Sequence, residues 1–213
     1  MMMELIAQTD VYTPAGDIIA ANVSEDDYMA RYAADHCEWV RGFVIKMSPT
    51  TDRHWELVFY LGLLLKAYLE LRPIGTVRGE PFVMKLSKDS RREPDLMVIL
   101  QEHANRLTTT HLQGPADICI EVVSPESYQR DRVDKLYEYQ KGGVTEYWII
   151  DPHKQEALFY RRDKAGVYVG QPLEGEHYRP LALPGFALHV PTLWQDSLPQ
   201  PGAVVSAVSA MLA

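Results

Sequence analysis

The sequence lacks most of the features that assign a function at first reading. Only two of its 213 residues are cysteines, Cys37 and Cys119, and their separation matches no metal-binding spacing. It also contains no glycine-rich phosphate loop and no Ser-His-Asp order. Zinc-ribbon, P-loop and triad-hydrolase classes are therefore excluded, and the scarcity of cysteine favours a reducing, cytoplasmic setting.

Long apolar runs are missing as well. Every such run is well short of the roughly 18 residues that a membrane-spanning helix needs. Residues 1–10 show no basic stretch followed by an apolar one, which is the pattern of a signal peptide. We therefore expect a soluble, cytoplasmic protein with no membrane partner.

Positive charge is in short supply. The chain carries 21 Lys and Arg against 29 Asp and Glu, which gives a formal net charge of -8. Broad, non-specific binding of nucleic acid depends on many Lys and Arg contacts to phosphates, so this balance argues against it. A local basic groove, or one completed by a second subunit, is compatible with the same charge.

The length of 213 residues suits one large domain with appendages. Residues 1–23 mix apolar and turn residues without a sustained period, and we expect them to form an N-terminal arm. Residues 24–195 are expected to form the main domain. No charge follows Asp196, so residues 196–213 are predicted to be a C-terminal tail that is either loose or docked on a partner subunit.

Apolar periodicity and turn residues predict alternating helices and strands. Helices are expected from Ser24 to about His36, from about 53 to 71 after a cap at Asp52, and from 126 to 141. Strands are expected as a hairpin at 38–47, at 81–86, 94–100, 118–123 and 146–151, and as an edge hairpin at 156–162 and 167–169. Residues 87–93 are predicted to be a polar turn and 101–115 a surface connection. The nearly continuous apolar runs at 94–100 and 118–123 are typical of strands covered on both faces of an α/β sheet.

Two of these central strands carry a carboxylate where a buried strand normally carries an apolar residue, namely Asp95 and Glu121. If the strands are neighbours, about 4.8 Å apart, the two acids converge at the end of the sheet, and they repel unless a positive charge lies between them. A hard cation, Mg²⁺ or Mn²⁺, fits, with the Val122 carbonyl as a third ligand, and it would activate water for hydrolysis. Taken alone, Asp95 is better explained as an exposed residue that follows a proline at the start of a strand.

A lysine on the following helix completes this hypothesis. Asp131, Lys135 and Glu138 fall on one face of the helix that returns across the strand just left. Lys135 near the site could orient water, assist its deprotonation, or neutralise charge on a phosphoryl oxygen. The alternative is a solvated ion pair with Asp131, which stabilises a helix only slightly.

A resemblance to a known family now adds to this interpretation. The motifs are Pro94-Asp95, Glu121-Val122-Val123-Ser124-Pro125, Asp131, Lys135, Tyr139, Gly143-Val144, Glu146-Tyr147-Trp148 and Asp151-Pro152, with Glu38, Gly42, Met47-Ser48-Pro49 and His54 upstream. Together they resemble the Uma2 restriction endonuclease family of the PD-(D/E)xK nuclease superfamily, over residues 24–195. The resemblance implies an α/β, restriction-endonuclease-like fold with a mixed central β-sheet flanked by α-helices and a metal site at its edge.

What the resemblance implies for function is a metal-dependent endonuclease that hydrolyses phosphodiester bonds, with DNA favoured as the substrate and a homodimer as the assembly. Asp95 matches the motif's Asp and Glu121 its second acid. The motif's Lys should follow two residues later, but Val123 stands there, and Lys135 is the candidate substitute. His54 matches a family position and either faces the site or caps or packs its helix. Glu80 is either an extra ligand or an exposed turn residue.

The rival hypothesis is a catalytically inactive nuclease-fold module that binds or regulates. The acidic charge and the absence of Lys at position 123 favour it. The retained pair of Asp95 and Glu121 opposes it. Geometry discriminates the two, because a catalytic Lys135 must point toward the two acids and not into bulk solvent.

Overall fold

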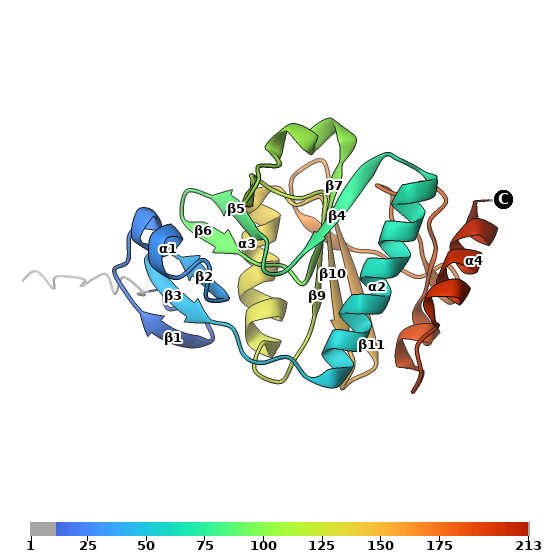
Figure 1. Cartoon of the computed structure of the whole chain (residues 1–213), viewed down its shortest axis with the longest axis horizontal. Helices are drawn as coiled ribbons and strands as arrows, with labels where there is room; N and C mark the ends of the chain where they lie inside the picture. The colour runs from blue at the N-terminus through green and yellow to red at the C-terminus, as the bar shows by residue number, and fades with distance from the viewer. Residues whose placement is uncertain (1–11, 213) are drawn as a thin grey trace, which may run out of the picture.

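The computed structural model describes residues 12–212 (Figure 1). Within this range the strands form two six-stranded sheets and one two-stranded ribbon. The outer sheet has the order β1 (Asp17–Ala20), β3 (Phe43–Lys46), β2 (Cys37–Val40), β6 (Ser90–Arg92), β5 (Val83–Ser87) and β8 (His111–Gln113). The central sheet has the order β12 (Tyr168–Gly170), β11 (Glu156–Arg162), β10 (Glu146–Asp151), β9 (Ile118–Val122), β7 (Leu96–Leu100) and β4 (Gly75–Gly79). The ribbon pairs β13 (His177–Tyr178) with β14 (Leu188–His189).

The helices are α1 (Glu25–Arg31), α2 (Asp52–Leu71), α3 (Lys135–Gly142) and α4 (Pro201–Met211). Two 3₁₀-helices span Gln101–Arg106 and Val190–Trp194, and a π-helical turn, Arg130–Asp134, leads into α3. The central sheet is mixed, because β9 and β10 run parallel whereas its other neighbouring strands run antiparallel. The predicted mixed α/β fold class is therefore confirmed.

Helices cover the central sheet on both faces (Figure 1). Alternate residues of β9, including Ile118 and Ile120, pack in one apolar core with α2 and α4. The intervening Cys119 belongs to a second core that contains Tyr139 of α3 and Met84 of β5. The period of two residues in a strand explains this division, since successive side chains point to opposite faces.

The long helix α2 begins at Asp52, one residue before its predicted start, and its cap moves back by one residue as well. The Thr51 hydroxyl accepts the His54 amide, so Thr51 and not Asp52 is the N-cap. The helix ends at Leu71, shortly before Pro73, because the residue that precedes a proline is disfavoured in helical backbone. The N-terminal turn of α2 thereby places His54 beside the end of β7.

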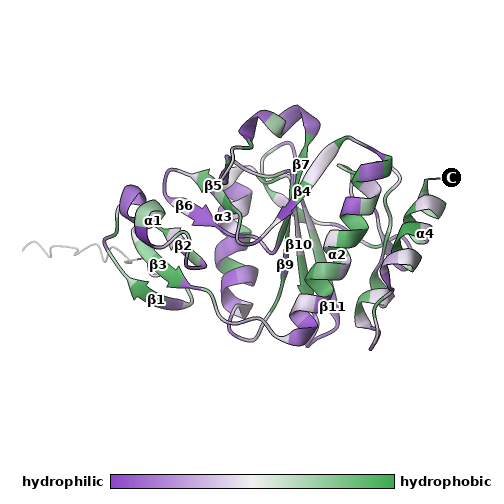
Figure 2. Cartoon of the chain, viewed as in Figure 1, coloured by the Kyte–Doolittle hydropathy of each residue, from purple (hydrophilic) through white to green (hydrophobic). Residues whose placement is uncertain are grey.

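The polar turn predicted at residues 87–93 is confined to Lys88 and Asp89, and the prediction was wrong for Ser90–Arg92. Ser90–Arg92 form the buried strand β6, which stands out as polar in Figure 2. Arg91 pairs with Glu25, and Arg92 pairs with Glu38. Two arginines in sequence resemble a solvated turn because their carboxylate partners lie far away along the chain. Strand β4 was missed, and the connection 101–115 contains a 3₁₀-helix and β8.

The predicted division into arm, main domain and tail stays a prediction, and residues 1–11 of the arm lie outside the described residues. Within the arm, β1 pairs with β3. Within the tail, α4 packs against α2 and buries Val204 and Val208 in the core, so this segment docks on its own chain. No helix between residues 12 and 212 is both long and apolar enough to cross a membrane.

Candidate active site at the end of β7 and β9

The two predicted acids lie on neighbouring strands. β7 and β9 pair antiparallel with Leu96 opposite Ile120 and Met97 opposite Cys119. Continuing this register by one position sets Asp95, the residue just before β7, opposite Glu121. The exposed-strand-start interpretation of Asp95 is wrong, since both residues are buried, at 6% and 2% relative exposure.

Asp95 is held by groups from two other elements. Its Oδ2 accepts the Val122 amide at 2.6 Å and lies 3.2 Å from Nε2 of His54. Its Oδ1 makes no hydrogen bond within the described residues, and Asp95 lines a cavity. Burial lowers the pKa of His54, but the hydrogen bond and charge of Asp95 outweigh burial and raise it. The imidazole is therefore favoured as a cation that donates to Asp95.

Lys135 points toward the acids and away from solvent. Its Nζ lies 2.9 Å from Oε2 of Glu121, 3.3 Å from Oε1 of Glu38 and 3.5 Å from Oδ1 of Asp131. Its side chain is 1% exposed, so the interpretation as a solvated ion pair is wrong. Burial opposes the charge of Lys135, yet the three carboxylates outweigh it and raise the pKa of Lys135 above its ordinary value.

Both carboxylate oxygens of Glu121 have a partner in the protein. Its Oε1 accepts the Tyr139 hydroxyl at 2.7 Å, and its Oε2 faces Lys135. Burial, together with the charges of Asp95, Asp131 and Glu38, raises the pKa of Glu121 well above its usual range despite Lys135. A site that penalises ionised carboxylates in this way gains from an added cation.

The cavity between these groups is small and polar. Its volume is about 30 Å³, room for a water molecule or an ion of similar size. The candidate site residues among those that line it are Asp95, Glu121, Val122, Lys135, His54 and Glu80. His54 has a buried Nδ1 without a hydrogen-bond partner. Both residues of uncertain role, His54 and Glu80, therefore border the candidate site.

Around these groups lies a second set of charged side chains, to which the sequence analysis assigned no role in the site. Glu38 of β2 accepts the Glu93 amide and pairs with Arg92 at 2.7 Å as well as with Lys135. His36 lies 3.0 Å from Oε2 of Glu93 and 3.4 Å from Oε2 of Glu80. The sequence did contain a signal for Glu38, because this carboxylate interrupts an apolar strand in the same way as Glu121 does.

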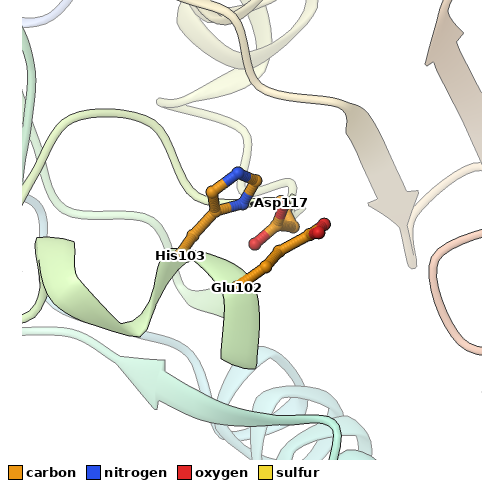
Figure 3. Close-up of side chains that lie close together, drawn as sticks. All are labelled: Glu102, His103 and Asp117. Atoms are coloured by element: carbon orange, nitrogen blue, oxygen red, sulfur yellow. Dashed lines mark hydrogen bonds and ion pairs between the residues drawn. The ribbon is translucent and has the colours of Figure 1, made fainter.

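Another group of ligand-type side chains lies at the opposite end of β9. Glu102, His103 and Asp117 each offer one atom within 4.8 Å of the others (Figure 3). Asp117 is already engaged there, since its two oxygens contact Nδ1 of His103 and the Leu100 amide, both at 2.7 Å. Among residues 12–212, no group of three such side chains that includes Asp95 and Glu121 meets that spacing.

The fold defines a class. A mixed sheet flanked by helices is the architecture of the restriction-endonuclease-like fold. The chain belongs to the Uma2 family, whose model, described as "Putative restriction endonuclease", matches residues 25–191. The predicted family is thus confirmed.

Comparison with solved structures supports the fold. The chain is similar to a "putative nuclease belonging to DUF820" from Anabaena variabilis ATCC 29413, with a TM-score of 0.67 and 17% sequence identity over 81% of this chain and 97% of that chain. At that identity the likeness shows the shared fold. No curated protein matches the chain.

Proposed function

We propose that this protein is a metal-dependent endonuclease that hydrolyses phosphodiester bonds, with DNA as its substrate. The observation that carries the proposal is that Asp95, just before β7, and Glu121 of β9 line one small cavity together with Lys135. Membership of a restriction endonuclease family supports the substrate class.

The donor set fits a hard divalent cation, Mg²⁺ or Mn²⁺. Asp95 would offer its free Oδ1, Glu121 a carboxylate oxygen and Val122 its backbone carbonyl, all oxygen donors of the kind these ions prefer. The bound cation would supply Lewis acidity and lower the pKa of water at the site. Its charge would also favour the ionised form of Glu121, whose pKa burial raises.

Each protein group then has a defined task. His54 donates to Asp95 and fixes the orientation of that carboxylate. Lys135, held protonated by three carboxylates, stabilises negative charge that develops on the phosphoryl oxygens and does not act as the general base. A homodimer would bring a second subunit's surface to an acidic chain, and this assembly remains a prediction from the family.

One observation favours the rival function, an inactive binding module. Both oxygens of Glu121 are already occupied, by Tyr139 and by Lys135. In that case the protein would bind nucleic acid without hydrolysing it, and divalent cations would not alter its stability.

The test is cleavage of labelled DNA and RNA with Mg²⁺, with Mn²⁺ and with EDTA. We expect cleavage of DNA only with a cation, and at least a 100-fold loss in the variants Asp95→Asn and Glu121→Gln. Glu102→Gln, in the other carboxylate group, is the matched control and should cleave normally. Activity that persists in EDTA or in both site variants contradicts the proposal.

A second measurement does not depend on turnover. At a Mn²⁺ concentration of about 100 times its dissociation constant, binding should stabilise the fold by about 2.7 kcal/mol and raise the melting temperature. Asp95→Asn should abolish this rise, whereas Glu102→Gln should retain it. An equal rise in both variants would assign the ion to another site.

A further inference from the structure

An apolar groove leads away from the candidate active site along α2. Its wall carries Trp55 and Phe59, which are 58% and 51% exposed although both are large aromatic side chains. Their rings are stacked, with centroids 5.2 Å apart and planes within 9° of parallel. Monomeric proteins seldom leave such a pair in water without a use for it.

The groove is continuous with the site. Asp95 and Glu80 line both the small polar cavity and this groove, whose volume is about 400 Å³. Two of the residues that line the groove, Gly62 and Gly79, have no side chain to fill it. A Cβ on Gly79 would lie 2.7 Å from the Asp95 carbonyl oxygen, and one on Gly62 would lie 3.4 Å from a methyl of Leu96. Flat aromatic walls and a low floor suit a planar ligand.

Charged side chains lie at the two ends of the groove and apolar ones lie between them, an order that suits a bound nucleotide strand. The acidic end holds Asp95 and Glu80, where a cation and the reacting phosphate would meet. Lys66 lines the other end of the groove. It lies about 16 Å beyond Trp55 along the helix axis, a length that a few nucleotides of a single strand can span. Between the two charged ends lie only apolar side chains and glycine.

From this arrangement, and on the basis of the proposed nuclease function, we infer that Trp55 and Phe59 form a stacking platform for an unpaired base next to the scissile phosphate. The protein therefore selects single-stranded, flapped or locally opened nucleic acid over intact duplex. Bases stack on exposed aromatic rings irrespective of their identity, and this contact supplies binding free energy that does not depend on phosphate charge.

The same surface has a rival occupant, a second copy of this chain. Interface cores between subunits are depleted of charged residues. This groove ends on the carboxylates of Asp95 and Glu80 at one side and on Lys66 at the other, so a subunit contact would have to remove three charged side chains from water. The groove chemistry thus favours the nucleotide, and the oligomeric state is measured as part of the test.

The test is binding of labelled 12-nucleotide single-stranded DNA, the matching RNA, the same DNA with an abasic position, and duplex DNA, with Ca²⁺ as the cation. Trp55→Ala and Phe59→Ala should each weaken single-strand binding by about 5- to 100-fold and leave duplex binding nearly unchanged. Trp55→Phe should retain binding. Tyr137→Ala removes an aromatic ring that is 49% exposed on α3, and it is the matched control.

Fluorescence gives an independent readout. Trp55 is 58% exposed, whereas Trp39 and Trp148 are 6% and 0% exposed and Trp194 is partly buried against the core. Quenching by the single strand should disappear in Trp55→Phe although binding remains, and it should shrink with the abasic strand. Unchanged affinity in both alanine variants overturns the inference, as does conversion of a wild-type dimer to monomers by Trp55→Ala in analytical ultracentrifugation.

The outcomes separate this inference from the proposed function. If cleavage depends on Asp95 but Trp55→Ala does not change single-strand binding, the nuclease function stands and the stacking platform is contradicted. Loss of single-strand binding in Trp55→Ala by a protein that never cleaves supports the platform and overturns the nuclease.

Discussion

Lys135 is the residue on which the charge balance of the candidate site depends most. Its ammonium faces Glu38, Glu121 and Asp131 at 3.5 Å or less in a region closed to solvent. Removing one partner of a buried ion pair is more costly than the pair is worth, because the remaining charges lose both water and counter-charge. The stability of the metal-free protein should therefore report directly on this residue.

We expect Lys135→Met to lower the free energy of unfolding by about 3–5 kcal/mol in EDTA, measured by urea denaturation at pH 7. The loss arises mainly at Glu38, where burial would raise the pKa of the carboxyl but Lys135, Arg92 and Arg130 outweigh burial and lower that pKa, so this carboxylate stays ionised. Lys88→Met is the control, because the Lys88 side chain is 89% exposed. A loss below about 1 kcal/mol would show that the carboxylates around Lys135 are not ionised.

Glu138 is a second residue whose charge belongs to the fold. Burial alone would raise the pKa of its carboxyl, but the Arg92 ion pair and hydrogen bonds from Arg92, Ser90 and Tyr12 outweigh burial and lower the pKa below its usual 4.5. A carboxyl with a depressed folded pKa contributes stability that is present above its unfolded pKa. That stability is lost as the pH falls through the folded pKa.

The Glu138→Gln variant should therefore be less stable than wild type at pH 7, with a difference that stays constant down to about pH 4.5 and shrinks below it. Urea denaturation of both proteins at pH 7, 5, 4 and 3 measures this difference. Glu70→Gln alters an exposed carboxylate and should leave the acid profile unchanged. A difference that grows on acidification would show that Glu138 is not held ionised by Arg92.

At the scale of elements, strand period determines where the acids point. In β9 the residues Ile118 and Ile120 pack toward α2, so Glu121 necessarily faces α3 and Lys135. The apolar runs of β7 and β9 were therefore sufficient to predict the central strands, and the convergence of the acids followed on the condition that these strands are neighbours, which they are. These predictions worked because the signal is local and repeats along the strand.

The elements that sequence reasoning missed depend on distant partners. β6 is built of Ser90, Arg91 and Arg92, and its burial is intelligible only with the carboxylates of Glu25, Glu38 and Glu138 in place. β4 holds glycines at both ends, where a Cβ would collide with the backbone of β7. Local propensity cannot reveal such strands, because burial of charge and close backbone approach are tertiary properties.

Two valines of helix α4 allow a test of whether the C-terminal tail packs on α2. Val208 is buried against α2 at 0% exposure, whereas Val205 on the same helix is 49% exposed. We expect Val208→Ala to lower the free energy of unfolding by about 1–3 kcal/mol, and Val205→Ala to change it by less than about 0.5 kcal/mol. Equal effects in urea denaturation would mean that α4 does not pack on α2 in solution.

At the scale of the whole molecule, charge limits how nucleic acid can be held. A chain with a formal net charge of -8 offers few cationic contacts, and Lys66 is the cation that lines the groove beside the site. Proteins that make 6–10 phosphate contacts lose about 10³–10⁵ in affinity between 50 and 200 mM salt. Binding that depends on stacking and one bound cation should be far less sensitive to salt.

We therefore expect the logarithm of the single-strand association constant to fall with the logarithm of NaCl concentration with a slope shallower than about -3, since each phosphate contact to a single strand contributes about -0.7. Lys66→Ala should make the slope shallower by about 0.7, and Lys88→Ala should not change it. Titrations at constant Ca²⁺ give the slopes. A wild-type slope steeper than about -5 would require a basic surface that this chain does not gather in the groove, and would point to a second subunit that supplies it.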